Sequence, residues 1–355
     1  MERKRAKCMK TEFYQINGTE QDVQSIRRAA KILQSGGLVG FPTETVYGLG
    51  ASALDADAAA KIYAAKGRPS DNPLIVHIAE PQDAEALAFV PPVFYRLAEA
   101  FMPGPLTVIL PKKDCVPDGV TGGLKTVALR CPSHPTAQML IRESGLPIAA
   151  PSANRSGCPS PTTAEHVLRD MDGRIEMILD GGPCEIGLES TVIRLTDDGC
   201  EILRPGAVTE IMLARVCGSV SVAKAVVDPS LAGDKPLSPG MKYKHYSPNA
   251  EVILVDASED AFAAYVREHC TKQDAVAAAD CDAGRYPGCA VLSLGQTENA
   301  GESSHHMFAL LRKADDCGRE RIFVRMPPAE GEYLALYNRL IRASGGKIVH
   351  INKEN

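Results

Sequence analysis

The sequence lacks the motifs that mark several common classes of protein. Its eleven cysteines include no C-x-x-C pair, which argues against a zinc ribbon or a thioredoxin-like site, and their odd number argues against a complete disulfide framework. No apolar run approaches the roughly 20 residues that a membrane-spanning helix needs. The basic residues at the start of the chain lead into no apolar stretch, so we expect no secretory signal there. These absences predict a cytoplasmic protein with reduced thiols and no membrane partner.

Signatures of familiar catalytic sites are absent as well. No serine stands in a G-x-S-x-G motif, and the stretch from Pro42 to Gly50 lacks the third glycine of G-x-G-x-x-G. Ser152 and Thr45 have no histidine beside them in a recognisable arrangement, so we expect no covalent enzyme intermediate. The adjacent His305 and His306 are expected at the solvated start of a helix, and we predict no metal site made by the protein.

The bulk composition predicts an ordinary globular protein of two domains. A chain of 355 residues is long for one domain and about right for two. Hydrophobic residues make up 45% and charged residues 23% of the chain, as in soluble proteins with a sizeable core. The formal net charge of -5 disfavours a protein whose main task is to coat nucleic acid, although it leaves room for a local basic cleft.

Strand and helix patterns divide the chain into two α/β parts joined by a linker. Residues 11–217 alternate irregularly between the two patterns, which favours a twisted, mostly mixed sheet flanked by helices. Residues 250–355 alternate regularly, so we expect a small Rossmann-like α/β domain with a parallel sheet and a structural or regulatory role. Residues 218–249 hold four prolines, as a linker would, but also two tyrosines and a histidine in the run Lys242 to Tyr246. We therefore predict a linker that lies over a ligand.

A short basic loop gives the first indication of a ligand site. An alanine-rich helix over residues 55–65 ends at Gly67, and two prolines then force extended backbone before a strand. We expect Lys66 and Arg68 to face solvent in a cleft, where a point charge and a planar guanidinium suit a phosphate ester or a carboxylate. The alternative is that both cations only complement the helix dipole.

Further cations and hydroxyl groups follow other predicted elements. Arg130 ends a strand over residues 126–130, at the edge where open α/β sheets gather ligands. The loop over residues 151–163 is dense in hydroxyls and amides, and it either forms turns only or holds phosphate oxygens. Together these groups predict a clamp for a phosphate plus a small polar acid, which would act by positioning and by charge on a transferring phosphoryl group. The set comprises Lys66, Arg68, Arg130, Arg204, Thr45, Asn72, Ser152, Asn154 and Thr191.

Several motifs, taken together and in order, resemble those of the L-threonylcarbamoyladenylate synthase family with its YrdC-like domain. The linker run Ser238–Pro248 resembles the one that marks the long, two-domain form of that family. The resemblance covers roughly residues 15 to 350. The motifs are Pro42–Gly50, Lys66–Pro69, Asn72–Leu74, Pro103–Thr107, Pro151–Asn154, Ser190–Thr191 and Arg204–Gly206.

The resemblance implies a nucleotidyltransferase that makes threonylcarbamoyl-AMP and pyrophosphate from L-threonine, bicarbonate or carbon dioxide, and ATP. In the family this product supplies the N6-threonylcarbamoyl group on adenosine 37 of tRNAs that read codons starting with A, and it is handed to separate tRNA threonylcarbamoyl-transfer proteins. Mg²⁺ is expected to accompany ATP, with no protein ligand identified. Cations matter more than a nucleophile here, because carbamate formation and attack on the α-phosphorus both build negative charge.

The resemblance also implies roles for residues of this sequence. Lys66 and Arg68 would be catalytic, and Tyr246 of the linker would close over the cleft. ATP would be bound by Arg68, Asn72, Thr126, Ser152, Asn154, Ser160, Arg204 and Tyr246, and L-threonine by Thr45, His77, Arg130 and Thr191. The strand pattern by itself favours a buried core position for His77. Lys244 and Ser247 stand where arginine and alanine are expected more often, which leaves the lid contacts open.

Two other hypotheses stand beside this one. A basic concave surface expected on the first domain would suit an RNA-binding module of translation, which predicts tight and strongly salt-dependent RNA binding. Direct RNA binding is also compatible with the enzyme, although the enzyme does not require it. The related carbamoyltransferase family of hydrogenase maturation is disfavoured, because its cysteine-rich zinc modules are absent from this sequence.

Overall fold

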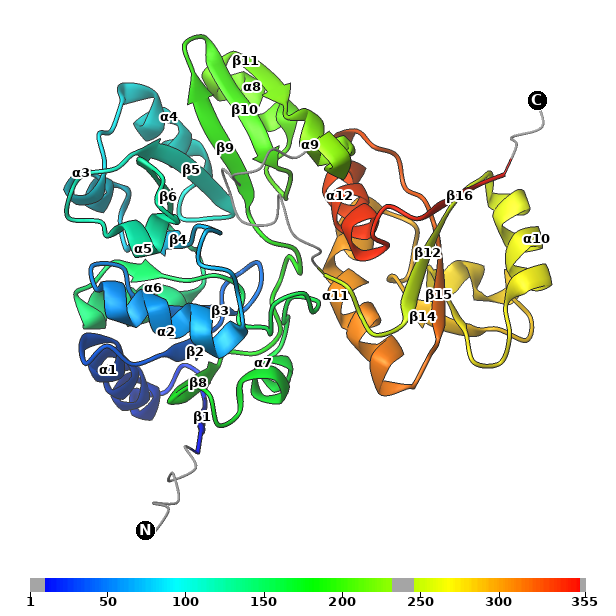
Figure 1. Cartoon of the computed structure of the whole chain (residues 1–355), viewed down its shortest axis with the longest axis horizontal. Helices are drawn as coiled ribbons and strands as arrows, with labels where there is room; N and C mark the ends of the chain where they lie inside the picture. Colours follow the sequence, from blue (N-terminus) through cyan, green and yellow to red (C-terminus); the bar gives the residue numbers. More distant parts are fainter. Residues whose placement is uncertain (1–9, 232–245, 352–355) are drawn as a thin grey trace, which may run out of the picture.

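The computed structural model describes residues 10–231 and 246–351, which form two α/β domains (Figure 1). The first range contains an 11-stranded sheet and the second a 5-stranded sheet. The expected fold class, a mixed sheet flanked by helices and followed by a smaller α/β domain, is confirmed. Within the two ranges, no helix combines the length and the apolar character that crossing a bilayer requires.

The first sheet is mixed. Its strands run in the order β1-β8-β2-β3-β7-β4-β6-β5-β9-β10-β11, with β4 and β6 parallel and β2 and β3 antiparallel. This arrangement brings the ends of strands that are far apart in sequence to one region of the sheet. The strands are β1 (Glu12–Gln15), β2 (Val39–Phe41), β3 (Gly48–Ser52), β4 (Ile75–His77), β5 (Leu106–Pro111), β6 (Thr126–Arg130), β7 (Ile148–Ala149), β8 (Met177–Asp180), β9 (Thr191–Thr196), β10 (Gly199–Arg204) and β11 (Ser219–Val222).

Local sequence signals explain where the functionally important helix α2 begins and ends. The Asp55 carboxylate accepts hydrogen bonds from the backbone N–H groups of Asp57 and Ala58, and Gly67 ends the helix in the left-handed region with φ of 63°. Lys66 is therefore the last residue of α2. The helices of this part are α1 (Glu20–Gln34), α2 (Ala56–Lys66), α3 (Ala84–Leu87), α4 (Pro92–Phe101), α5 (Asp118–Thr121), α6 (Pro135–Ser144), α7 (Ala164–Met171), α8 (Glu210–Cys217) and α9 (Lys224–Val227), with short 3₁₀ turns η1 (Pro81–Asp83) and η2 (Pro229–Leu231).

The second sheet is parallel throughout, as expected from the regular alternation of its elements. Its order is β14-β13-β15-β12-β16. Figure 1 shows α11 and α12 on the side that faces the first domain and α10 on the opposite side. The elements are β12 (Glu251–Asp256), α10 (Glu259–His269), β13 (Ala275–Ala278), η3 (Asp280–Arg285), β14 (Ala290–Ser293), α11 (Ala300–Asp316), β15 (Arg321–Arg325), η4 (Gly331–Tyr333), α12 (Leu334–Ala343) and β16 (Ile348–His350).

Some elements escape prediction because their sequences carry weak local signals. β3 reads Gly-Leu-Gly-Ala-Ser and β13 reads Ala-Val-Ala-Ala, and neither run is rich in the large β-branched residues typical of strands. Both strands are completely buried, so pairing and burial in the sheet override their composition. β11 and α9 lie inside the range expected to be a linker, and β11 pairs with β10 as the edge of the first sheet. Of that range, residues 232–245 lie outside the described residues.

The two domains share a buried interface. Val46 and Leu188 of the first domain belong to the same apolar cluster as Tyr246 and residues of the second sheet and its helices. His305 of α11 is not at a solvated helix start as expected, because its Nδ1 lies 2.7 Å from the carbonyl oxygen of Glu185 in the first domain. The helix itself starts at Ala300, earlier than the pattern indicated, and this places His305 against the neighbouring domain.

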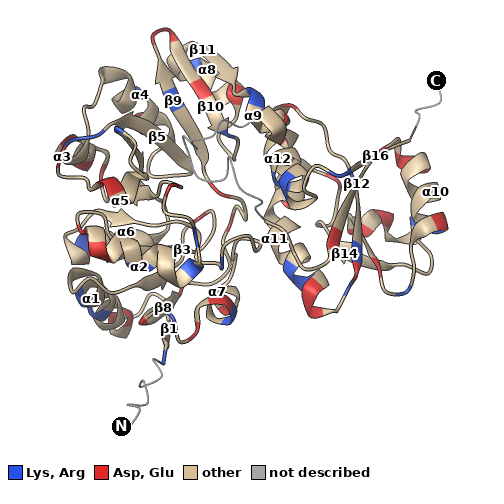
Figure 2. Ribbon diagram, in the orientation of Figure 1, with Lys and Arg blue, Asp and Glu red and all other residues tan. Residues whose placement is uncertain are grey.

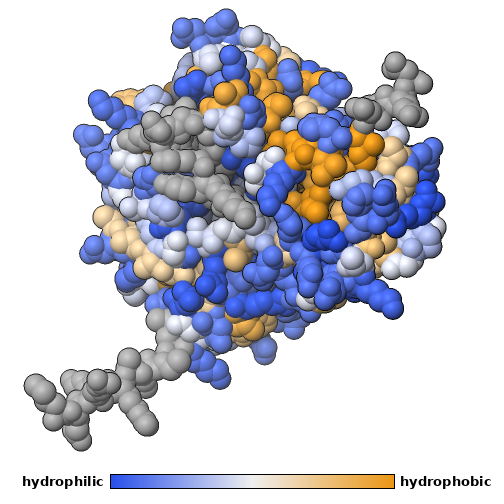
Figure 3. All heavy atoms as spheres, turned by 45° about the vertical axis from the view of Figure 1, so that its right-hand side comes forward, coloured by the Kyte–Doolittle hydropathy of each residue, from blue (hydrophilic) through white to orange (hydrophobic). Residues whose placement is uncertain are grey.

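The surface carries charges of both signs. Figure 2 shows Lys and Arg interspersed with Asp and Glu along the elements of both domains. Most of the face in Figure 3 is hydrophilic, with hydrophobic residues gathered in one area near its centre. A nearly balanced surface of this kind agrees with the small net charge of -5.

Candidate active site

A cavity of about 670 Å³ opens in the first domain, where residues that follow β2, α2 and β7 meet Tyr246. Many of the side chains that the sequence singled out converge there. The expected site residues that line the cavity are Lys66, Arg68, His77, Arg130, Ser152, Asn154, Arg204 and Tyr246. Thr43, Ser156 and Glu189 also line it and were not among the expected residues.

Five expected residues do not line the cavity: Thr45, Asn72, Thr126, Ser160 and Thr191. Thr126 is at the opposite end of β6 from Arg130, about 13 Å away for a strand of this length. The Thr191 hydroxyl donates to the Val208 carbonyl at 2.8 Å and so is used within the protein. The substrate contacts expected of these five residues therefore stay predictions.

Two of the five support residues that do line the cavity. The Ser160 hydroxyl donates to Glu189 at 2.5 Å, and the hydroxyls of Thr45 and Thr43 lie 2.9 Å apart. The side-chain oxygen of Asn72 is buried with no hydrogen-bond partner among the described residues, while its backbone carbonyl accepts from Arg68. Ser160 and Thr45 therefore hold residues of the cavity wall, whereas the Asn72 side-chain oxygen is left without a partner in the described part of the chain.

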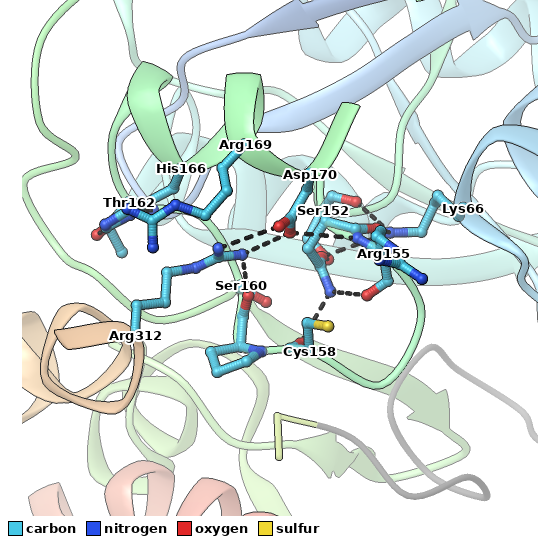
Figure 4. Close-up of polar contacts among 12 residues, drawn as sticks. Lys66, Ser152, Arg155, Cys158, Ser160, Thr162, His166, Arg169, Asp170 and Arg312 are labelled. Atoms are coloured by element: carbon cyan, nitrogen blue, oxygen red, sulfur yellow. Dashed lines mark hydrogen bonds and ion pairs between the residues drawn. The ribbon is translucent and has the colours of Figure 1, made fainter. Parts of the chain in front are cut away.

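Lys66 does not face solvent as expected. Its side chain is only 4% exposed, because the end of α2 is covered by the loop after β7. Its Nζ donates to the carbonyl oxygens of Ser152 at 2.5 Å and Asn154 at 2.6 Å (Figure 4). Burial, assisted by the nearby guanidinium of Arg68, lowers the pKa of Lys66 well below its usual value. Lys66 thus lines the cavity and also holds the backbone of its wall in place through these two hydrogen bonds.

The loop after β7 is held from its other side by the second domain. Arg312 of α11 donates to the Asp170 carboxylate at 2.7 Å and to the Pro159 carbonyl at 2.6 Å. Figure 4 shows the Arg312 guanidinium directed at Asp170. The backbone N–H of Arg155 donates to the same carboxylate at 3.3 Å. Lys66 and Arg312 therefore anchor opposite ends of one loop, which fixes the position of the wall between them.

Two arginines of the cavity have carbonyl and hydroxyl oxygens as partners. Arg68 donates to the carbonyls of Asn72 and Pro73, with the closest contact at 3.0 Å. Arg204 donates to the carbonyl of Ser190 at 3.0 Å and to its hydroxyl at 3.1 Å. Burial lowers the pKa of each guanidinium to about 10, which keeps both charged at neutral pH. Because these contacts do not neutralise them, both arginines can attract an anion.

Arg130 and His77 form a different subsite on paired strands. Arg130 makes an ion pair with Glu44 at 2.7 Å, with both side chains 5% exposed, and lies opposite His77 in the register of β6 and β4. Burial, followed by the charge of Arg130, lowers the pKa of His77 to about 3, so this imidazole is neutral. Arg130 Nε and His77 Nδ1 are buried and have no partner among the described residues. Unsatisfied polar atoms of this kind call for an explanation, and a polar ligand provides one.

Arg339 of α12, in the second domain, contacts two residues that line the cavity. Its Nε donates to the Glu189 carboxylate at 2.9 Å, and its guanidinium carbon lies 5.7 Å from the ring centre of Tyr246. Burial alone would raise the pKa of Glu189, but Arg339 and Arg204 outweigh it and hold that pKa below its usual value. Tyr246 has φ of 65°, unusual for a residue with a side chain, and packs against Phe308. One arginine thus supports two cavity residues at once.

Sequence reasoning could have found Glu189 but not Arg339. Glu189 immediately precedes the Ser190-Thr191 motif, so extending that motif by one residue would have included it. Arg339 stands in an ordinary amphipathic helix, 150 positions from its partner, with no local feature to set it apart. No group of three or more His, Cys, Asp or Glu suited to a metal occurs among the residues described. The site therefore offers separated cations and a neutral polar pocket.

Comparisons with known proteins cover almost the whole chain. A family profile described as telomere recombination matches residues 31–206, and another described as the C-terminal domain of threonylcarbamoyl-AMP synthase matches residues 208–345. The chain is 44% identical to the threonylcarbamoyl-AMP synthase of Bacillus subtilis over 96% of this chain and 100% of that one. It is 46% identical to that of Pyrococcus abyssi over 92% and 96% of the two chains.

A solved structure agrees with these matches. The crystal structure of P. abyssi Sua5 complexed with L-threonine superimposes with a TM-score of 0.87 and 43% sequence identity. The superposition covers 96% of this chain and 99% of that one, so both domains and their arrangement are included.

Proposed function

The chain belongs to the threonylcarbamoyl-AMP synthase family and forms threonylcarbamoyl-AMP, and on this premise we propose that the cavity lined by Arg68, Arg130 and Arg204 is where it joins L-threonine, bicarbonate and ATP. The observation that carries the proposal is that three arginines from separate segments open onto one cavity beside a neutral histidine. Such a site suits an anionic nucleotide next to a small zwitterion.

The reaction would be a nucleotidyl transfer in two steps. The amine of threonine adds to carbon dioxide, released from bicarbonate with loss of water, and gives up a proton to leave a carbamate. A carbamate oxygen then attacks the α-phosphorus of ATP, and the bond from that phosphorus to the bridging oxygen breaks to release pyrophosphate. Negative charge grows at the phosphorus without any covalent bond to the protein, so fixed cations supply the stabilisation.

The phosphates would lie against Arg68 and Arg204. Both remain charged at neutral pH, and their existing partners are uncharged oxygens, which leaves their charge available to a ligand. Lys66 would act mainly by positioning, since it fastens the backbone of Ser152 and Asn154 beside the nucleotide. Mg²⁺ would enter with ATP and help neutralise the triphosphate when bound; the described residues offer no group of carboxylates for a separate metal site.

Threonine would lie against Arg130 and His77. The guanidinium would take the carboxylate of threonine, while its ion pair with Glu44 fixes its direction. The neutral imidazole of His77 cannot protonate the attacking amine at neutral pH, because its pKa is about 3. This leaves the amine free to be deprotonated and to attack carbon dioxide.

The wider role follows from the product. Threonylcarbamoyl-AMP is an activated donor, so a separate transfer protein would pass its threonylcarbamoyl group to adenosine 37 of tRNAs that read codons starting with A. We therefore expect the chain to act in the cytoplasm, where tRNA is modified. Direct RNA binding is not needed for this role.

The activity is tested by pyrophosphate release from ATP in the presence and absence of each other substrate. Release should require L-threonine and bicarbonate together, and Arg68→Ala should abolish it while Arg96→Ala, on a helix that does not line the cavity, should not. Equal release without threonine would show that the proposed reaction is wrong.

A further inference from the structure

A second cavity, of about 550 Å³, lies in the C-terminal domain and shares no lining residue with the first. It opens at the carboxyl ends of β13 and β15, beside Ala278 and Arg325. The chain leaves β13 toward β14 at one edge of the sheet and leaves β15 toward β16 at the other. Neighbouring strands whose connections diverge in this way form the crevice where parallel α/β sheets bind ligands.

Two hydroxyl groups that line this cavity are available to a ligand. The side chains of Tyr286 and Ser303 are in residues only 5% and 3% exposed, and both line the cavity. Within residues 10–231 and 246–351, neither hydroxyl makes a hydrogen bond. In the free protein these hydroxyls can be reached by solvent in the cavity, so a ligand there can bond to both without displacing a partner within the protein.

The charges of the cavity disfavour a phosphate or carboxylate ligand. Glu259, Asp282 and Glu298 line it, and among its lining residues the one cation, Arg325, pairs with Glu298. The connection from β12 to α10 also contains no glycine that would let a phosphate approach the backbone closely. The cavity therefore suits a ligand that donates hydrogen bonds, such as one carrying hydroxyl groups.

The rest of the wall is apolar and partly aromatic. Phe262 and Tyr286 meet edge to face with ring centres 5.9 Å apart, and the alanines at the end of β13 leave an open apolar surface next to them. A flat heterocycle fits against such a wall, and carboxylates at strand ends commonly accept hydrogen bonds from ribose hydroxyls. We propose that this cavity binds an unphosphorylated nucleoside, with the base on the aromatic wall and the ribose hydroxyls donating to the carboxylates.

The test is calorimetric titration of the full chain with adenosine in saturating AMP, which by the proposed function should fill the first cavity. One adenosine should bind per chain, and Ser303→Val or Asp282→Asn should weaken it roughly tenfold, as expected for one lost hydrogen bond. The matched controls are Ser304→Val and Asp280→Asn, which change neighbours that do not line the cavity and should leave the affinity unchanged.

Three outcomes would overturn the proposal: no adenosine binding in saturating AMP, equal weakening by the control variants, or wild-type affinity in both Ser303→Val and Asp282→Asn. Asp282 is on a short surface turn, so its variant provides an answer even where Ser303→Val fails to fold. None of these outcomes depends on pyrophosphate release, so the proposal stands or fails separately from the activity of the first cavity.

Discussion

Replacing Arg339 by methionine should destabilise the protein far more than breaking an exposed ion pair across the same domain interface. Arg339 is completely buried and its partner Glu189 is 8% exposed, so the substitution leaves a carboxylate in the interface without its cation. Loss of one partner of a buried pair costs about 3 to 5 kcal/mol. The control is Arg169→Met, whose pair with Asp316 is about half exposed and should contribute less than about 1 kcal/mol.

Urea denaturation followed by circular dichroism measures both losses. A further variant, Glu189→Gln, removes the charge that needs the cation. The double variant Glu189→Gln with Arg339→Met should therefore lose less stability than Arg339→Met by itself. The difference between the double variant and the sum of the single ones is the coupling energy, expected at about 1 to 3 kcal/mol for contacting groups. A loss from Arg339→Met no greater than that from Arg169→Met, or fully additive losses, would refute the reasoning.

The same variant gives a pH signature. In the natural protein Arg339 and Arg204 hold the pKa of Glu189 below its usual value, so this carboxylate contributes stability that is present above its unfolded-state pKa and lost as pH falls through the folded-state pKa. Without Arg339, less opposes the effect of burial, so the pKa of Glu189 should rise and the carboxylate should take up a proton at higher pH. The stability deficit of Arg339→Met should therefore shrink as pH is lowered, whereas a deficit that came only from lost packing would not change.

Other substitutions test the cavity. Lys66→Met should lose about 2 kcal/mol or more of stability as well as activity, since buried carbonyls of Ser152 and Asn154 lose their donor; an unchanged melting temperature would contradict this. Arg68→Lys keeps the charge but loses the planar fork, and should lower threonine-dependent pyrophosphate release about 100-fold with a melting temperature close to that of the natural protein. The stability that depends on neutral His77 is complete above pH 6.5 and is lost as pH falls toward 3. In denaturation measured across that range, the free energy of unfolding of His77→Asn should therefore fall less steeply with decreasing pH than that of the natural protein.

The sequence by itself determined the elements that carry much of the cavity. Asp55 and Gly67 fix the two ends of α2, because capping involves groups within a single helical turn, and this placed Lys66 and Arg68 at a helix end. The strand over residues 126–130 is found with the expected bounds and puts Arg130 at its carboxyl end. The order of the motifs also identified the family, since each motif is a local feature that can be read without the fold.

Only the tertiary structure decided which of these residues reach the cavity and what supports them. Lys66 is buried because a loop more than 80 positions later folds over it, and Glu189 meets Arg339 across 150 positions. β3 became a strand despite its glycines because β2 and β7 pair with its two edges and the helices α1 and α2 pack against it. Helix ends and turns depend on a few adjacent residues, whereas burial and ion pairing depend on segments brought together by packing, and no short stretch of sequence specifies those partners.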